Sequence, residues 1–483
     1  MSVLGQLEPQ RVFYYFEEIT RIPHGSGNVD AISNYLANFA KERGLFYIQD
    51  ELKNVIIVKE ASKGYEKEPA VILQGHMDMV AVKTPDCSID LKREGLQIAT
   101  DGDAVFAKGT SLGGDDGIAV AYALAILESD TMKHPRLEVV FTVDEEVGME
   151  GATGIDLSML TAKRMLNLDS EDEGILLTGC AGGVRQKCTL MLQQKEQRGT
   201  AYKITVAGLL GGHSGVEIHK ERGNAINLLG RILCEIGRAC TFHLMHAEGG
   251  EADNAIPREA SAVILLSDSE ESVLEATVSR LNREIAKELA TRDGNVQIAF
   301  LKLGTTAAMC AEANDTHRAS GFLWALPNGV QCMSADVEGL VETSLNLGVL
   351  RYEAGEFSVT ISLRSSVESA KKALVEKVAA ITRLAGGSYT LAGDYPGWKY
   401  RADSPLRDKM VRIYEAMYGE KPKVEAVHAG LECGIIADKI PDLDCVSFGP
   451  QMENIHTTEE RLSISSTRRV WEYLLKILEE REE

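Results

Sequence analysis

Short apolar runs alternate with stretches of helical periodicity in the first part of the chain. The runs at 54–59, 71–74 and 137–143 have the length and composition of buried strands. The segments 9–22 and 118–127 carry apolar residues on a helical repeat, the second directly after a glycine-rich loop. Because strands that alternate with helices build sheets covered on both faces, this pattern predicts an α/β fold with a mostly parallel sheet.

The pattern changes after about residue 183. From there, runs typical of strands (203–206, 262–266 and 357–363) are separated by long helical segments (224–237, 270–290 and 367–384). This arrangement predicts an α+β layer with helices on one face of an antiparallel sheet. The first pattern returns near the C-terminus, with helices at 404–418 and 465–480 and a strand at 444–448. The simplest organisation is one α/β domain made of 1–183 and 397–483, with a second domain, 184–396, inserted.

Acidic residues outnumber basic ones, with 72 Asp and Glu against 51 Lys and Arg and a formal net charge of −21. Such a surface repels phosphates, so the sequence argues against a nucleic-acid partner. No stretch reaches the roughly 20 apolar residues that span a bilayer, and the N-terminus has no signal-peptide pattern, so we expect no membrane partner. The nine cysteines are unevenly spaced without a C-x-x-C pair, which favours reduced thiols in a cytoplasmic protein.

Acidic and histidine side chains follow several predicted strands or open helices: His76 and Asp78, Asp115 and Asp116, Glu145 and Glu146, Asp169 and Glu171, and His456. Residues two apart on an extended chain point the same way, so His76 and Asp78 are expected on one face. Parallel sheets place their chemistry at the carboxyl ends of the strands. Charges gathered there would repel each other without a cation. Mixed imidazole and carboxylate ligands suit Zn²⁺, with Co²⁺ or Mn²⁺ as alternatives.

These motifs also have ordinary structural interpretations. Asp115 and Asp116 at the start of a helix are good capping residues without any metal. Glu145 and Glu146 after a strand also fit a solvated region at a helix N-terminus. The glycines before Asp115 could instead suggest a phosphate loop, but the pattern G-x-x-x-x-G-K-[ST] is absent. The order and number of the motifs therefore carry more weight than any one of them.

In sequence order, the motifs G-H-M-D-M-V, G-T-S-L-G-G-D-D-G, D-E-E-V-G-M-E-G, N-L-D-S-E and I-H-T-T-E-E resemble those of the M20 metallopeptidase family. The resemblance covers nearly the whole chain and is closest to the branch that hydrolyses aminoacyl-histidine (Xaa-His, including β-Ala-His) dipeptides. It implies a zinc-peptidase-like catalytic domain with an inserted α+β lid domain. It also implies a homodimer, often formed through the inserted domain.

Carried over position by position, the resemblance implies a two-metal cluster and a cis peptide bond between Asp115 and Asp116. The implied metal ligands are His76, Asp115, Glu146, Asp169 and His456, with Asp115 bridging the two ions. Glu145 matches the general base, and Asp78 matches the acid that orients His76. Asp116 stands where some relatives have Asn, so we do not expect it to be a ligand.

The resemblance also implies residues that contact the substrate. In the inserted domain, His213 of G-G-H-S-G would stabilise the oxyanion, and Asn254 and Arg364 would hold the substrate. Arg364 suits a C-terminal carboxylate, which a guanidinium binds through two hydrogen bonds. In the motif H-A-G-L-E, Gly430 or Glu432 would contact the amino end of the substrate. The structural alternatives are a turn role for His213 and a surface ion pair for Arg364.

The expected function is therefore a cytoplasmic, zinc-dependent dipeptidase that cleaves Xaa-His dipeptides by metal-assisted attack of water. A tripeptidase or an N-acyl amino acid hydrolase with the same site is the first alternative. A catalytically inactive metal-binding or interaction protein on the same fold is the second, and the presence of all five ligands and the base argues against it.

Overall fold

Two large sheets, built from different stretches of the chain, organise the computed structural model, which describes residues 2–481. The chain folds into two compact units, each with its own sheet and its own apolar core. Unit 1 contains the residues up to Gly179 together with Tyr400–Ala426 and the chain from Leu431 onward. Unit 2 contains Cys180–Lys399 and the short segment Val427–Gly430.

Unit 1 is built on an eight-stranded sheet with the order β1-β2-β6-β3-β7-β21-β8-β20. The strands are β1 (Phe46–Gln49), β2 (Val55–Lys59), β3 (Val71–His76), β6 (Leu137–Thr142), β7 (Arg164–Asn167), β8 (Ile175–Cys180), β20 (Lys423–Val427) and β21 (Asp444–Ser447). The four central strands β6, β3, β7 and β21 are parallel, whereas β1, β2 and β8 pair antiparallel with their neighbours. The sheet is thus parallel at its centre, where the sequence predicts fully buried strands, and mixed at its sides.

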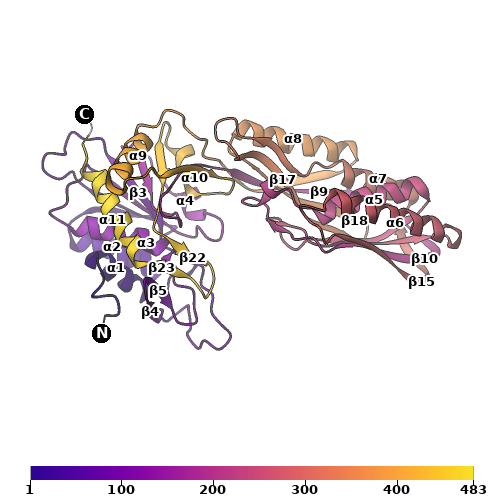
Figure 1. The fold of residues 1–483 in the computed structure, drawn as a ribbon, viewed down its shortest axis with the longest axis horizontal. Coiled ribbons are helices and arrows are strands. Elements are labelled where there is room, and N and C mark those ends of the chain that lie inside the picture. The colour runs from indigo at the N-terminus through magenta and orange to yellow at the C-terminus, as the bar shows by residue number, and fades with distance from the viewer. Residues whose placement is uncertain (1, 482–483) are drawn as a thin grey trace. The chain divides into compact units, whose positions relative to one another are not determined.

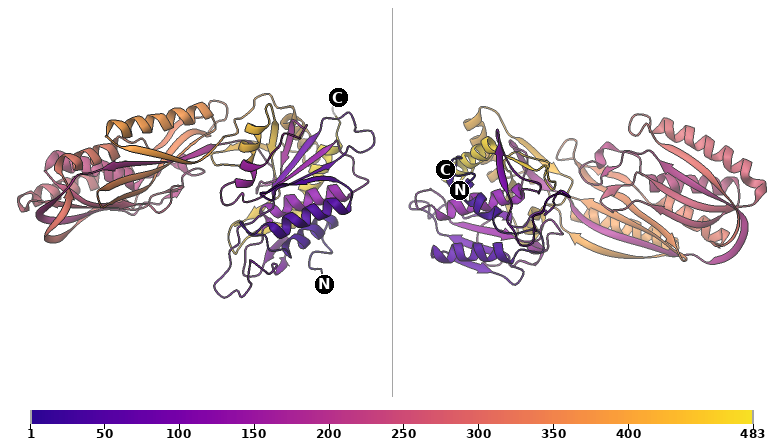
Figure 2. Two further views of the ribbon diagram at one scale, coloured as in Figure 1. Left: turned by 180° about the vertical axis from the view of Figure 1, so that it is seen from behind. Right: turned by 90° about the horizontal axis from the view of Figure 1, so that it is seen from below.

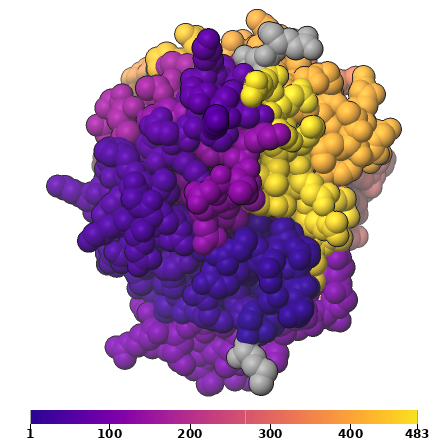
Figure 3. Space-filling view, turned by 90° about the vertical axis from the view of Figure 1, so that its left-hand side faces the viewer, coloured from indigo at the N-terminus to yellow at the C-terminus, as the bar shows by residue number. Residues whose placement is uncertain are grey.

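Helices cover both faces of this sheet. One face packs against α1 (Gln10–Thr20), α2 (Asp30–Glu42), α3 (Gly114–Glu128), α9 (Pro405–Tyr418) and α11 (Ile464–Glu479), which share one apolar core with alternate residues of the central strands (Figure 2). The short helices α4 (Glu150–Gly154) and α10 (Glu432–Lys439) pack against the other face. Figure 3 shows the indigo N-terminal segment beside the yellow C-terminal segment. A hydrogen bond also joins α3 to α11, since the Tyr122 hydroxyl donates to the carbonyl of Thr467 at 2.8 Å.

A small four-stranded sheet completes unit 1. Its strands are β4 (Ile98–Asp101), β5 (Ala104–Ala107), β22 (Met452–Glu453) and β23 (Arg461–Ser463), in the order β22-β23-β5-β4. The loop between β22 and β23 carries His456, whose backbone φ is +62°. The left-handed conformation is uncommon outside glycine, although histidine is among the residues that adopt it more readily.

Unit 2 is a nine-stranded sheet with helices on one face (Figure 1). Its strands are β9 (Gly182–Met191), β10 (Gln194–Ala207), β12 (His243–Gly249), β14 (Ala260–Leu266), β15 (Gln297–Ala311), β16 (Gly329–Met333), β17 (Val341–Glu353), β18 (Glu356–Ser365) and β19 (Ser388–Tyr395). The helices are α5 (Ala225–Ala239), α6 (Glu271–Glu288), α7 (Ala313–Ala325) and α8 (Glu368–Leu384), and they share an apolar core with the sheet. Neighbouring strands of this sheet run antiparallel, as the sequence predicts for this region.

The division between the units differs in detail from the one expected from sequence. Unit 2 begins at Cys180 rather than at 184 and ends at Lys399 rather than at 396. It also takes in Val427–Gly430, which the sequence analysis placed in the α/β domain, because Ala429 accepts a backbone hydrogen bond from Ala181 at 2.9 Å. Across the part of the chain that the structure describes, no helix combines the length and apolar character that crossing a bilayer requires.

Candidate metal centre

The carboxylate of Asp115 lies at the centre of a cluster of acidic and imidazole side chains in unit 1. His76 Nε2 lies 3.1 Å from one of its oxygens and His456 Nε2 lies 2.9 Å from the other. The three residues come from β3, from the start of α3 and from the loop between β22 and β23. One carboxylate therefore joins two imidazoles that stand 380 positions apart in the sequence.

Glu145, Glu146 and Asp169 complete the cluster. Glu145 and Glu146 follow β6, and Asp169 follows β7, so the parallel pairing of β6, β3 and β7 brings them to the end of the sheet where β3 ends in His76. Glu146 Oε1 lies 2.9 Å from His456 Nε2, and Asp169 Oδ1 lies 3.6 Å from His76 Nε2. The structure thus brings together all five ligands expected from sequence, along with the expected base.

The residues fall into three groups whose ligand atoms lie within 4.8 Å of one another: His76, Asp116 and Asp169; His76, Glu145 and Glu146; and Asp115, Glu146 and His456. The first group includes Asp116, which the sequence analysis did not expect to be a ligand. Asp116 is completely buried, one of its oxygens accepts from the backbone N–H of His76 at 3.3 Å, and the other has no hydrogen-bond partner among the described residues. The peptide bond between Asp115 and Asp116 is cis, as the family resemblance implies.

Closely spaced carboxylates dominate the electrostatics of the cluster. Burial alone would lower the pKa of His76, but the neighbouring carboxylates of Asp115 and Asp169 outweigh it and raise that pKa well above its usual value. Hydrogen bonds to Asp115 and Glu146 raise the pKa of His456 to about 10. Burial raises the pKa of Asp169 to about 7. Protons are therefore held tightly here, as expected where several carboxylates share a dry site.

This donor set fits divalent metal ions. Imidazole nitrogens and carboxylate oxygens are the ligands that Zn²⁺, Mn²⁺ and Co²⁺ share, and among the described residues the buried Oδ1 of Asp116 has no hydrogen-bond donor. Buried carboxylates without such donors are costly unless a cation accompanies them. His76 and Asp169 would hold one ion, Glu146 and His456 another, and Asp115 lies between the two sets.

Asp78 occupies a position behind His76. Its backbone carbonyl accepts a hydrogen bond from His76 Nδ1 at 3.0 Å, while its carboxylate lies 3.5 Å from the same nitrogen. The carboxylate also accepts from the Ser26 hydroxyl at 2.8 Å and from the backbone N–H of Glu145 at 3.2 Å. Since Nδ1 is the donor in this arrangement, Nε2 is left to face the cluster, which is the orientation that a metal-binding imidazole needs.

Two positioning residues escaped the sequence analysis. Ser26 belongs to the turn-rich segment after α1 and contacts Asp78 through the hydrogen bond just given. Glu460, in the motif I-H-T-T-E-E, is buried and accepts from the backbone N–H groups of Leu112, Gly113 and Gly114 at 2.7, 3.1 and 2.8 Å. It thereby fixes the glycine-rich loop that leads into Asp115. The motif contained a signal for this role, because a carboxylate suits a loop rich in free N–H groups.

His213 is positioned within unit 2 by a tight turn. It lies in β11 (Gly212–His213), which pairs with β13 (Ala255–Ile256). Its Nδ1 accepts from the backbone N–H groups of Gly215 and Val216, both at 3.2 Å. Burial and the nearby charge of Arg364 lower the pKa of His213. The ring is therefore neutral at pH 7 with its proton on Nε2, and Nε2 is available as a hydrogen-bond donor.

Arg364 is a nearly buried guanidinium in β18, with 9% of its surface exposed. Within residues 2–481, its one side-chain hydrogen bond goes from Nη1 to the Tyr395 hydroxyl at 3.0 Å, and Nε is buried without a partner. Among the described residues, no carboxylate lies within ion-pair distance of it. This arrangement argues against the surface ion pair that was the structural alternative. A buried guanidinium of this kind is suited to an anionic ligand.

The remaining predicted substrate residues lie in different surroundings. Asn254 is exposed beside β13, and its carbonyl accepts from the backbone N–H of Ser214 at 2.8 Å. Gly430 lies under the ring of Tyr395, since a Cβ at this position would come within 2.8 Å of Tyr395 Cε2. Glu432 belongs to unit 1 and is completely buried at the start of α10.

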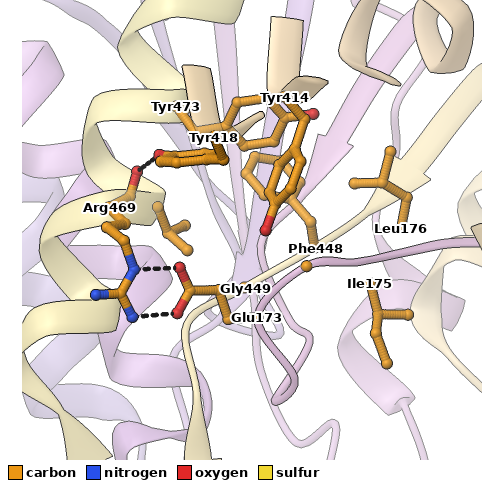
Figure 4. Close-up of a pocket in the computed structure, with 11 residues that line it drawn as sticks. Glu173, Ile175, Leu176, Tyr414, Tyr418, Phe448, Gly449, Arg469 and Tyr473 are labelled. Atoms are coloured by element: carbon orange, nitrogen blue, oxygen red, sulfur yellow. Dashed lines mark hydrogen bonds and ion pairs between the residues drawn. The ribbon is translucent and has the colours of Figure 1, made fainter. Parts of the chain in front are cut away.

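A separate cavity in unit 1 has another character. It lies between α9, α11 and β8 and is lined by three tyrosines, Phe448 and a double ion pair between Arg469 and Glu173 (Figure 4). Its interior volume is about 10 Å³, which is near the lower limit for holding a single water. The cavity is therefore too small for a peptide and belongs to the packing of the C-terminal helix.

Comparison with known proteins gives matches along the whole chain. The model of peptidase family M20/M25/M40 matches residues 72–480, a range that includes every residue of the cluster. The cytosol non-specific dipeptidase of Escherichia coli (strain K12) is 37% identical over 483 residues, covering 99% of each chain. The aminoacylhistidine dipeptidase from Vibrio alginolyticus has a similar structure, with a TM-score of 0.94, 36% identity, and coverage of 99% of this chain and 98% of that one. Aminopeptidase PepT from Bacillus cereus shares the fold, with a TM-score of 0.56 and 17% identity over 98% of this chain and 99% of that one.

Proposed function

The chain belongs to peptidase family M20/M25/M40, and on that premise we propose that it is a metal-dependent dipeptidase that accepts Xaa-His dipeptides, including β-Ala-His. The observation that carries this proposal is the Asp115 carboxylate with His76 on one oxygen and His456 on the other. A carboxylate held in this way between two sets of ligands is suited to bridging two metal ions. Zn²⁺ is the metal we propose, two ions per subunit, with Co²⁺ or Mn²⁺ as substitutes.

Metal ions in this cluster would polarise the scissile carbonyl and lower the pKa of the attacking water towards neutrality. The chain's own residues supply the remaining steps. Burial and the neighbouring carboxylates raise the pKa of Glu145 well above its usual value. A carboxyl group with a raised pKa suits a residue that takes a proton from water and passes it to the leaving amine. Asp78 would act by holding His76 with Nε2 towards the cluster.

Residues of unit 2 are proposed to bind the substrate. The Nε2–H of His213 is suited to donate to the oxyanion, because the turn fixes the tautomer and the ring stays neutral. Arg364 is suited to the C-terminal carboxylate of the dipeptide, because its guanidinium has no acidic partner among the described residues. Asn254 would add a further polar contact from the exposed side of β13.

The substrate preference is the part of the proposal that most needs a measurement. The names of the two relatives that match over nearly the full length imply different substrate ranges: one is a non-specific dipeptidase and the other an aminoacylhistidine dipeptidase. The test compares kcat/KM for Xaa-His dipeptides, other dipeptides, tripeptides and N-acyl amino acids, after metal analysis of the purified protein. Preferred cleavage of tripeptides or of N-acyl amino acids would reject the dipeptidase. If none of these compounds is hydrolysed in a chelator-sensitive way, the protein is not a peptidase of this kind, and the alternative of an inactive metal-binding protein is favoured.

The role of Glu145 can be tested separately. Glu145→Gln, reloaded with metal, should lose at least about 100-fold in kcat, the lower range for a general base, and keep its metal content. Glu150→Gln, a change of the same kind at an exposed position at the start of α4, is the matched control and should retain activity. Full activity in the Glu145 variant would reject this mechanism.

We also propose a cytoplasmic homodimer formed through unit 2. Support comes from β15, an edge strand of the nine-stranded sheet, which exposes Leu301, Leu303 and Met309 by 61, 52 and 55%. Unpaired strand edges with exposed apolar side chains are common sites of association. The nine cysteines are free thiols, which fits a reducing compartment. Light scattering should give a dimer mass for the wild type and a monomer for Leu303→Lys, whereas a wild-type monomer would reject the proposal.

A further inference from the structure

Glu432 is a completely buried carboxylate directly behind the metal cluster. One of its oxygens, Oε2, accepts from the Gln74 side-chain amide at 2.6 Å and from the Thr142 hydroxyl at 2.6 Å. Its other oxygen is buried and has no hydrogen-bond partner in the part of the chain that the structure describes. Burial raises the pKa of this carboxyl group to about 7. A group that costs this much to bury needs a compensating role.

The partners of Glu432 come from the strands that carry the metal ligands. Gln74 is two residues before His76 on β3, and Thr142 ends β6, three residues before Glu145. The side-chain amide of Gln74 extends this series of hydrogen bonds, because its oxygen accepts from the Asn167 side chain at 2.5 Å. Asn167 ends β7, two residues before Asp169.

The register of the sheet shows that these contacts are on one face. In the parallel pairs, His76 stands opposite Thr142 and Gln74 stands opposite Asn167. Residues paired in this way point to the same side of a sheet, as do residues two apart on a strand. Glu432 therefore reaches from α10 onto the face that carries His76. Its hydrogen bonds tie the end of β3 to the end of β6, and the hydrogen bond from Asn167 to Gln74 extends this link to β7.

We propose that Glu432 is a positioning residue for the metal site: it links the ends of β3 and β6 directly, and that of β7 through Gln74, and so sets the spacing of His76, Glu146 and Asp169. This inference rests on the proposed function only in requiring that the cluster binds metal. It assigns Glu432 a role away from the substrate, in contrast to the contact with the substrate's amino end that its motif suggested. Groups that hold metal ligands in place commonly change metal affinity by about 10- to 100-fold when they are replaced.

Strand β6 offers a matched control at its opposite end. Glu138 is also completely buried, and it accepts from the backbone N–H groups of Thr161 and Ala162 and from Arg136 at 3.0–3.1 Å. It lies near the start of the strand, away from the ligands at the other end. Replacing either glutamate removes a buried carboxylate from the same sheet, but of the two only Glu432 contacts β3 and β6 at the ends that carry the ligands.

The experiment measures Zn²⁺ affinity by competition with a chromophoric chelator, using the full-length protein stripped of metal. Glu432→Gln should weaken Zn²⁺ binding by about 10-fold or more, whereas Glu138→Gln should change it less than about two-fold. Thr142→Val, which keeps the shape but removes one of the two donors, should weaken binding by a smaller factor. The visible spectrum of the Co²⁺-loaded protein should change in Glu432→Gln and stay unchanged in Glu138→Gln, because it reports ligand geometry.

The outcomes separate this inference from the proposed function. A wild-type chain that binds no metal would reject the proposed function itself. If the wild type binds metal, equal affinity in Glu432→Gln would overturn the positioning role. Equal losses in the Glu432 and Glu138 variants would also overturn it, since they would indicate general loosening of the sheet. If Glu432→Gln does not fold, Thr142→Val decides the matter, and wild-type affinity in that variant counts against the proposal.

Discussion

Gly75 provides a sharp test of how closely the metal cluster is packed. This residue lies in β3 immediately before His76, and a Cβ on it would come within 2.4 Å of Asp116 Oδ2 and within 2.6 Å of Ala119 Cβ. Non-bonded heavy atoms prefer a separation of roughly 3.5–4.0 Å, so Gly75→Ala must push the strand and α3 apart by about 1 Å. Overpacking of this kind typically costs about 1–3 kcal/mol.

The displacement should affect function more than stability. Asp116 also accepts from the backbone N–H of His76, so the forced movement acts on the residues on both sides of the cluster. A misplacement of about 1 Å in a catalytic site commonly costs about 100-fold in rate. For a unit of this size, a loss of about 1–3 kcal/mol corresponds to a decrease in Tm of about 2–12 °C. Both quantities should be measured, with Tm taken on metal-free protein so that bound metal does not mask the change.

Gly321→Ala is the control for this substitution. Gly321 is exposed within α7 and an added Cβ would have no neighbour within 4 Å, so the change should stabilise the helix by about 0.5–1 kcal/mol and leave activity unchanged. If Gly75→Ala kept the Tm and kcat of the wild type, the close approach of strand and helix described here would be incorrect.

Three further changes have defined outcomes. Burial and the nearby Arg364 lower the pKa of His428 to about 3. An unfolded histidine has a pKa of about 6.5, so on acidification His428 takes up a proton in the unfolded chain before it does so in the folded one. Between about pH 7 and pH 5 the free energy of unfolding of the wild type should therefore fall by about 2 kcal/mol more than that of His428→Asn, measured by urea unfolding. Glu460→Gln should weaken the loop before Asp115 and lower metal affinity, and unchanged chelator competition would argue against its role. Tyr395→Phe removes the hydroxyl that accepts from Arg364, so KM should rise several-fold with kcat nearly unchanged, and a fall in kcat alone would contradict the substrate-binding role of Arg364.

The sequence predicted the parts of the fold where hydrophobic pattern and burial agree. The run at 137–143 became β6 (Leu137–Thr142), and the helix expected at 465–480 became α11 (Ile464–Glu479). The pattern missed β15 (Gln297–Ala311) entirely, because this edge strand is largely exposed and its apolar residues do not alternate regularly with polar ones. It also missed α7, whose apolar positions are few and interrupted by polar residues. Edge strands and half-exposed helices leave a weak signal because burial imposes little on them.

The sequence motifs predicted the metal ligands of the site, but only the structure revealed the residues that hold the functional side chains in place. His76, Asp115 and His456 could be named from sequence because each lies in a motif with a recognisable family pattern. The partners Ser26 and Tyr395 could not, since a serine in a turn and a tyrosine at a strand end have no pattern of their own, and only the chain path brings them to Asp78 and Arg364. Similarly, nothing in H-A-G-L-E indicates that Glu432 is turned into the sheet rather than towards a ligand.

The position of β21 (Asp444–Ser447) has a consequence for synthesis on the ribosome. This strand is inserted between β7 and β8, although it is made long after both of them. The middle of the unit 1 sheet therefore stays incomplete until β21 itself has left the exit tunnel. A nascent chain that stops before Asp444 should be digested by protease within unit 1 while its unit 2 segment survives. Equal resistance of both segments would show that the sheet closes without its late strand.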